Sequence, residues 1–150
     1  MHNENCSREL IVSKVKVEEK GKQAIFLNPT RTKVRKTQID GCLIKQTTAC
    51  DWLVVRDGAE GVLVELKGCD VAKAIEQIEA TFVYLKSNGG LARKMAALIV
   101  CRNPPNHPSF SSKLLRAKNR LSTAYKAPLH IVSGNYEFQF EKLLSHKGPL

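Results

Sequence analysis

The segment from Lys94 to Cys101 constrains the fold more than any other part of the chain. It reads Lys-Met-Ala-Ala-Leu-Ile-Val-Cys, which is a continuous apolar run of strand length. Such a run is typical of a β-strand buried on both faces, whereas a half-exposed strand alternates apolar and polar residues. The chain is therefore predicted to be an α/β protein in which helices pack against a sheet.

Two amphipathic helices flank this strand in the sequence. Asp70 is a good N-cap for the first helix, and apolar residues recur at helical spacing over residues 71–86. A serine cap at residues 111–112 opens the second helix, which runs to about Tyr125. The Pro-rich segment 103–108, between the strand and the second helix, excludes regular structure.

The rest of the sheet is predicted to be mixed. Several short segments with strand character precede the first helix and make an antiparallel meander, with a turn at Asp57-Gly58, where positive φ is tolerated. The predicted strands are residues 11–17, 33–45, 51–55, 62–67, 94–101, 129–132 and 136–140, and residues 24–27 form a short apolar run. The order β-β-β-α-β-α-β describes a mixed central sheet flanked by helices.

Length and composition set further bounds. The chain has 150 residues, for which a single domain over residues 1–150 is expected. No apolar run approaches the ~18–20 residues of a membrane span. The polar residues 1–6 also lack the apolar stretch of a signal peptide. We therefore expect a cytoplasmic protein that does not associate with membranes.

The cysteines are odd in number and scattered, with no Cys-x-x-Cys pair. In a cytoplasmic protein they are expected to be reduced and mostly buried, with Cys42 and Cys50 facing each other across strands. The four histidines provide no cluster for a zinc site. The five cysteines are Cys6, Cys42, Cys50, Cys69 and Cys101.

The charge is unevenly distributed along the chain. The net charge is +10, and no Asp or Glu occurs over residues 80–136, a stretch of 57 residues with nine basic side chains. A field of one sign attracts polyanions, which favours nucleic acid as the partner, although a basic surface can also be simply solvated. The basic residues of the second helix, which could grip phosphates, are Lys113, Arg116, Lys118 and Arg120.

Three charged residues in the meander form a candidate site. Glu65 and Lys67 are two residues apart on a strand, so both project from one face. If Val55 pairs with Leu63 across a loop around residues 57–61, Asp51 lies opposite Lys67 and diagonal to Glu65. A two-residue turn would instead move Asp51 away from the pair.

Two carboxylates beside an ammonium group form a site of hard oxygen ligands. Such a site suits Mg²⁺, which prefers a few carboxylates together with water and phosphate oxygens. The alternative is a cross-strand salt bridge, in which Lys67 merely neutralises Asp51 or Glu65.

The pattern Asp51-(13 residues)-Glu65-Leu66-Lys67, followed by Gly68 and an amphipathic helix, resembles the PD-(D/E)xK nuclease superfamily. This is the fold of many restriction endonucleases and Holliday-junction resolvases, and the resemblance covers residues 33–132. The commonest form of the motif has Pro at the position of Cys50, but that position varies in the superfamily.

The resemblance implies a role for each matched residue. Asp51, Glu65 and the Leu66 carbonyl would coordinate Mg²⁺ or Mn²⁺, and Lys67 would orient or activate the attacking water. Gln77, on the following helix, fits a Gln that many members place near the site. Many members use one more acid, for which Glu9, Glu18, Glu19 and Asp40 are candidates that the sequence does not separate.

The function implied is metal-assisted hydrolysis of phosphodiester bonds by an endonuclease, with DNA favoured over RNA. Nucleases of this fold often act in repair, restriction or defence, and many are homodimers. Two alternatives remain at this stage. One is a catalytically inactive nucleic-acid-binding module on the same fold, and the other is a structural or interaction protein with an incidental cluster of ion pairs.

Overall fold

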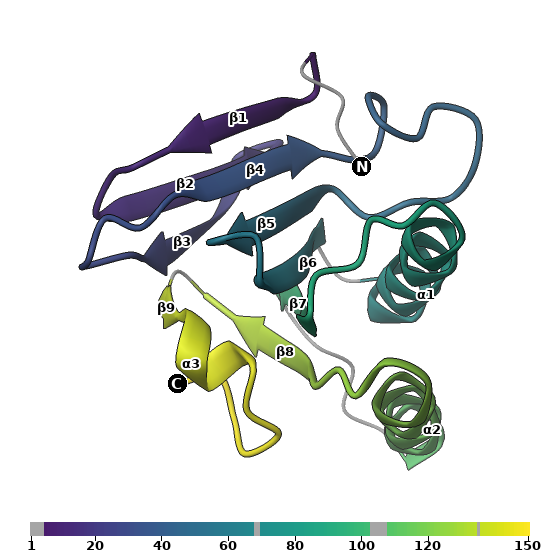
Figure 1. Ribbon diagram of the computed structural model, residues 1–150. Helices are drawn as coiled ribbons and strands as arrows, with labels where there is room; N and C mark the ends of the chain where they lie inside the picture. Colours follow the sequence, from purple (N-terminus) through teal and green to yellow (C-terminus); the bar gives the residue numbers. More distant parts are fainter. Residues whose placement is uncertain (1–4, 68–69, 103–107, 135) are drawn as a thin grey trace.

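The computed structural model describes residues 5–67, 70–102, 108–134 and 136–150 (Figure 1). Its main sheet has six strands in the order β1-β4-β5-β6-β7-β8. The pairs β1–β4, β4–β5 and β5–β6 are antiparallel, whereas β6–β7 and β7–β8 are parallel. The strands are β1 (Ser7–Leu10), β4 (Val34–Gln38), β5 (Trp52–Arg56), β6 (Glu60–Lys67), β7 (Lys94–Cys101) and β8 (Leu129–Ser133).

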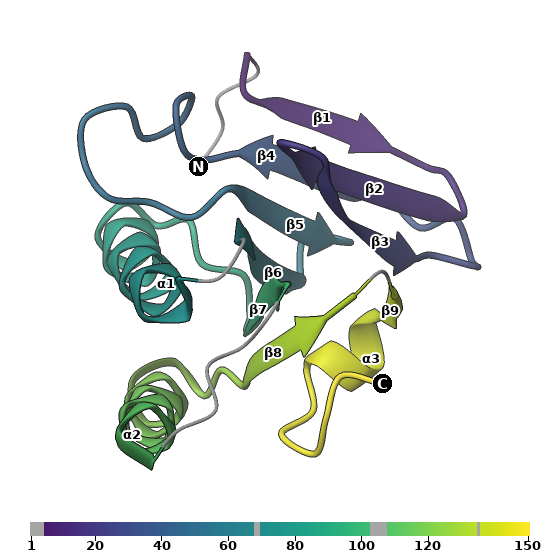
Figure 2. The ribbon, with the colours of Figure 1, turned by 180° about the vertical axis from the view of Figure 1, so that it is seen from behind.

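Two helices cover one face of this sheet, as Figures 1 and 2 show from opposite sides. They are α1 (Val71–Ser87) and α2 (Pro108–Tyr125). Asp70 caps α1, because its carboxylate accepts a hydrogen bond from the Lys73 backbone N–H at 3.0 Å. The helices bury apolar residues such as Phe82 and Leu121 against Ile99 of β7 and its neighbours. These helices and the parallel strands confirm the predicted α/β class with a mixed sheet.

A second, smaller sheet covers the other face (Figure 2). It has the order β2-β3-β9, and a short helix follows it in the chain. Phe26, Phe138 and Phe140 pack here against Leu98 and other residues of the main sheet. Because Leu98 and Ile99 lie in different clusters, β7 is buried on both faces as predicted. The elements are β2 (Lys14–Glu19), β3 (Lys22–Leu27), β9 (Glu137–Gln139) and α3 (Phe140–Leu143).

Several predicted strands need correction. The strand expected over residues 11–17 is β2, shifted to 14–19, and it pairs with β3 in the second sheet instead of joining the meander. The strand expected over 33–45 ends at Gln38, because the chain then folds into turns with Gly41 at φ +79°. The segment 136–140 splits into β9 and the start of α3.

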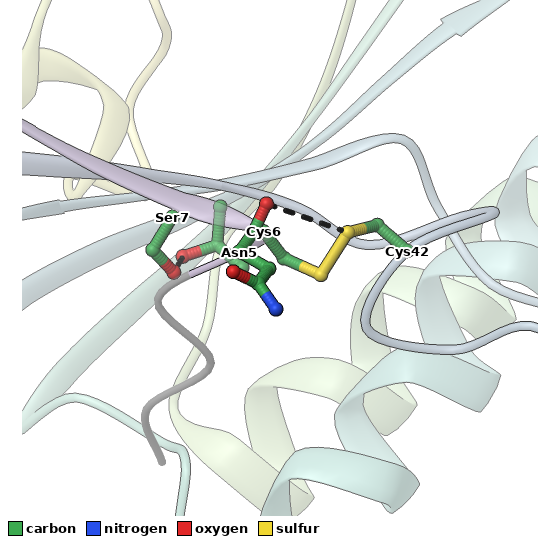
Figure 3. Close-up of a disulfide and its surroundings, with 5 residues drawn as sticks. Asn5, Cys6, Ser7 and Cys42 are labelled. Carbon is green, nitrogen blue, oxygen red and sulfur yellow. Dashed lines mark hydrogen bonds between the residues drawn. A yellow bond between two sulfur atoms is a disulfide. The ribbon is translucent and has the colours of Figure 1, made fainter.

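The cysteine prediction was wrong for two of the five residues. Cys6 and Cys42 form a disulfide that joins the start of β1 to the turn after β4 (Figure 3). Cys42 therefore does not face Cys50 as a thiol. Cys50 and Cys101 are buried free thiols, as predicted. Cys69 and the Pro-rich residues 103–107 lie outside the described residues.

In the part of the chain that the structure describes, no helix is both long enough and apolar enough to cross a membrane.

Candidate functional site

Asp51 and Glu65 lie side by side at one end of the β5–β6 pair. The register joins Trp52 to Val64 and Leu53 to Leu63, so its extension by one residue places Asp51 directly opposite Glu65. Both carboxylates are buried, with exposures of 7% for Asp51 and 1% for Glu65. Residues directly opposite in an antiparallel pair project from the same face, which here is the face that α1 covers.

The predicted register was wrong by two residues. Val55 pairs with Gly61 and not with Leu63, because the hairpin loop has three residues instead of five. Asp57 and Gly58 both adopt positive φ, and the Ala59 N–H closes the loop on the Arg56 carbonyl at 3.0 Å. The shorter loop moves Asp51 from the predicted place opposite Lys67 to the place opposite Glu65. The two acids are therefore closer neighbours than predicted.

A hydrogen bond fixes the orientation of the Asp51 carboxylate. Its Oδ2 atom accepts the backbone N–H of Leu66 at 2.8 Å. The β5–β6 pairing ends at Trp52 and Val64, so the Asp51 side chain takes the place of a neighbouring strand for Leu66. The N–H and C=O of one residue in a strand point toward the same neighbour. The Leu66 carbonyl, a predicted metal ligand, therefore lies on the Asp51 side of β6.

Helix α1 holds the chain segment that leads into Asp51. Gln77 is buried, and its Nε2 donates a hydrogen bond to the Ala49 carbonyl at 3.2 Å. The Thr81 hydroxyl accepts the Cys50 N–H at 2.9 Å and donates to the Gln77 carbonyl at 2.7 Å. Gln77 thus lies beside the residues that precede Asp51, as the resemblance implied. Thr81 was missed, although a Thr within the apolar stripe of α1 is a visible signal.

The Gln77 side chain has one polar atom that is not satisfied. Its Oε1 is buried and accepts no hydrogen bond from the described residues. A buried amide oxygen without a donor costs free energy, on the order of 1–3 kcal/mol. Because Nε2 anchors the amide on Ala49, Oε1 is held in a fixed position close to the segment that carries Asp51.

The pKa of the Cys50 thiol depends on its burial and on the charges of the site. Burial raises the pKa of this thiol strongly, the hydrogen bond with Thr81 opposes the shift, and the nearby charges of Glu65 and Asp51 raise the pKa further. Cys50 is therefore a protonated thiol at neutral pH and not a nucleophile.

Of the other predicted acids, three lie on distant strands, and Asp40 lies on the segment next to Cys50. Glu9 lies on β1 and forms ion pairs with Arg35 and Lys33. Glu18 and Glu19 lie on β2, in the sheet on the opposite face. Asp40 is exposed, and its backbone N–H donates to the Cys50 carbonyl at 3.1 Å.

Lys67 ends strand β6, where its backbone is paired with Cys101 of β7. Its side chain lies outside the described part of the structure, as do residues Gly68 and Cys69.

The basic residues of α2 differ in the flank of the helix on which they lie and in whether they are paired with an acid. At 100° per residue, Lys113, Arg116 and Arg120 fall on one flank of the helix and Lys118 on the other. Lys113, Arg116 and Lys118 are exposed. Arg120 is engaged instead with Glu79 of α1, whose carboxylate accepts hydrogen bonds of 2.6 and 3.0 Å. Arg120 is thus a weaker candidate for phosphate than predicted.

The donor set fits a hard divalent cation. No group of three or more His, Cys, Asp or Glu side chains suited to a metal occurs among the described residues. Mg²⁺ does not need such a group, because one or two carboxylates with waters and substrate phosphate oxygens complete its shell. Asp51, Glu65 and the Leu66 carbonyl offer oxygen donors only.

Comparisons with protein-family models, with curated proteins and with solved structures found no match to this chain. Its function must therefore be argued from its own residues.

Proposed function

We propose that this protein is a nuclease that uses Mg²⁺ or Mn²⁺ to hydrolyse phosphodiester bonds, on a restriction endonuclease-like fold. One observation carries the proposal, which is the buried pair of Asp51 and Glu65 at the end of β5 and β6. Placing two carboxylates side by side in an interior is unfavourable for folding unless a cation or a proton compensates the repulsion. A pair held in this way is expected where a cation is bound for chemistry.

The order of the elements supports the same fold. An antiparallel β4–β5–β6 meander is followed by α1, by the parallel strand β7, and by α2 and β8. The carboxylates lie on the second and third strands of this core, immediately before the first helix, which is the arrangement that the motif requires.

The site residues have different roles in the proposed hydrolysis. Asp51, Glu65 and the Leu66 carbonyl would hold the cation, which when bound polarises the phosphoryl group and acidifies a water. Lys67, two residues after Glu65 on β6, would position the attacking water or stabilise the developing negative charge. Gln77 and Thr81 hold residues 49–50 and so position Asp51.

The proposed substrate is nucleic acid, with DNA favoured over RNA. The net charge of +10 and the acid-free residues 80–136 support a polyanionic substrate. Lys113 and Arg116 are exposed on one flank of α2 and are the best placed of the helix residues to contact phosphates.

The test is cleavage of labelled single-stranded, duplex and branched DNA and of RNA, with Mg²⁺ or Mn²⁺. Asp51→Asn, Glu65→Gln and Lys67→Ala are each expected to lower the cleavage rate by at least about 100-fold. The matched controls are Glu76→Gln and Lys73→Ala, which make the same changes of charge at exposed positions of α1. Cutting that persists in the Asp51 and Lys67 variants would overturn the site. Salt-sensitive binding without any cutting would favour the inactive binding module.

A further inference from the structure

A cavity lies at the carboxyl ends of β7 and β8, separate from the carboxylate pair. Its volume is about 420 Å³. The two strand ends form one wall and the turn between β2 and β3 forms the other. The lining residues that matter here are Gly21, Lys22, Gln23, Arg102, Ser133 and Gly134.

The topology makes this position a natural binding crevice. From β7 the chain continues into α2, which packs on the helix-covered face of the main sheet. From β8 it continues into β9 and α3, which pack on the opposite face (Figure 2). Neighbouring parallel strands whose connections leave to opposite faces open a crevice between their carboxyl ends. Ligands of open α/β sheets bind at such switch points.

The chemistry of the lining suits a phosphate group. The charged lining residues are Lys22 and Arg102, and none of the residues that line the cavity is acidic. Neither cation forms an ion pair with another described residue. Gln23 and Ser133 add uncharged donors, and Gly134, at φ +102°, allows the chain to turn directly after β8. Arg and Lys with small polar groups are the usual ligands of phosphate.

The cavity lies close to the candidate site along one edge of the sheet. Lys67 on β6 is paired with Cys101 on β7, which is paired with Ser133 on β8. Neighbouring strands are 4.7–4.9 Å apart, so the Lys67 and Ser133 backbones are about 10 Å apart. The cavity and the carboxyl end of β6 therefore lie at the same edge of the main sheet, although the β2–β3 wall of the cavity is on the face opposite to the carboxylates.

We propose that this cavity binds one phosphate group of a nucleic-acid strand, with Lys22 and Arg102 supplying the charge. The recognition of phosphate rests on the cavity alone, whereas the role of the strand as a substrate rests on the proposed function.

The experiment measures binding without cleavage. Affinity of the Asp51→Asn protein for a fluorescent single-stranded oligonucleotide is followed by anisotropy in EDTA over a range of salt concentrations. Adding Lys22→Gln and Arg102→Gln is expected to lower the affinity about 5-fold at 0.1 M salt. The slope of log affinity against log salt should fall in magnitude by about 0.7, the value for one phosphate contact on a single strand. The control is Arg93→Gln with Lys94→Gln, which removes two exposed charges near the amino end of β7.

A second measurement addresses the cavity directly. Titration with sodium phosphate, against sodium chloride of equal ionic strength, should shift the amide resonances of Gly21 and Gly134 in the parent protein and not in the Lys22/Arg102 variant. Equal losses of strand affinity in both pairs of variants would overturn the proposal, because only bulk charge would then matter. A shift with phosphate but no loss of strand affinity would assign the cavity to free phosphate compounds and overturn its role in strand binding. Because no cleavage is measured, the result is independent of whether the protein cuts.

Discussion

Replacing Glu65 by Gln should change stability in a direction that separates a metal site from a salt bridge. The opposed register places the Cβ atoms of Asp51 and Glu65 about 5 Å apart. If the two carboxylates are also about 5 Å apart, their like charges repel by about 3 kcal/mol at an effective dielectric constant of about 20. If Glu65 is held for a cation, Glu65→Gln without divalent ions should raise the free energy of unfolding by about 1–3 kcal/mol, because this repulsion is removed.

The assay is urea unfolding at pH 7 in EDTA, followed by circular dichroism. The control is Glu76→Gln, whose side chain is exposed on α1 and whose effect should stay within about 0.5 kcal/mol. In parallel, Mg²⁺ at ten times its dissociation constant should stabilise the wild type by about 1.4 kcal/mol and leave Glu65→Gln unchanged. If Glu65→Gln instead destabilises the protein by 1 kcal/mol or more, the carboxylate serves stability, and the salt-bridge interpretation replaces the site.

Two further predictions concern the fold. The disulfide between Cys6 and Cys42 spans a sequence separation of 36, so the Cys6→Ser/Cys42→Ser variant should lose about 4 kcal/mol of unfolding free energy under oxidising conditions. A loss that is equally large when both proteins are compared in dithiothreitol would show that the cause is not the bond. For His130, burial lowers the pKa in the folded state, so the unfolded state binds the proton more readily. Stability should therefore be complete above the unfolded-state pKa of about 6.5 and decline as the pH falls toward the folded-state pKa. His130→Gln should flatten this decline in urea titrations between pH 7.5 and 5, and an unchanged decline would assign it to other groups.

Elements with strong local signals could be predicted from the sequence. The strand over residues 94–101 has the same bounds in the structure, and the helix predicted over 71–86 is α1 with one more residue. Apolar periodicity and the Asp70 cap are local properties, so they hold whatever the rest of the fold does. By contrast, β1 (Ser7–Leu10) has no apolar period and was missed, because it is a strand only through its pairing with β4.

The site shows the same division. The spacing of Asp51, Glu65 and Lys67, followed by a helix, was enough to select the candidate residues. The spacing did not predict which residues of the two strands lie opposite each other, because the hairpin register depends on the length of one loop. A sequence with Asp57-Gly58 allows loops of two, three or five residues. The change from five to three residues shifts the register by two and gives Asp51 a different partner on the same face, whereas a two-residue loop shifts it by an odd number and reverses the faces.

Contacts between residues far apart in the chain could not be predicted from the sequence. Cys6 and Cys42 meet because β1 pairs with β4, and Arg120 meets Glu79 because α1 and α2 lie side by side on the sheet (Figure 1). The same holds for the phosphate cavity, whose Lys22 and Arg102 come from different sheets.

The sequence alone determined the class of the fold. The doubly buried strand at 94–101 and its two amphipathic helices follow from hydrophobic burial, and the apolar pattern that indicates burial is a property of each short segment. It also settled which charged residues are unusual for a strand. The tertiary structure decided which of them face one another, which cations are already paired with acids, and where the sheet opens a crevice. These depend on loop lengths and on packing between segments far apart in sequence, which no local pattern encodes.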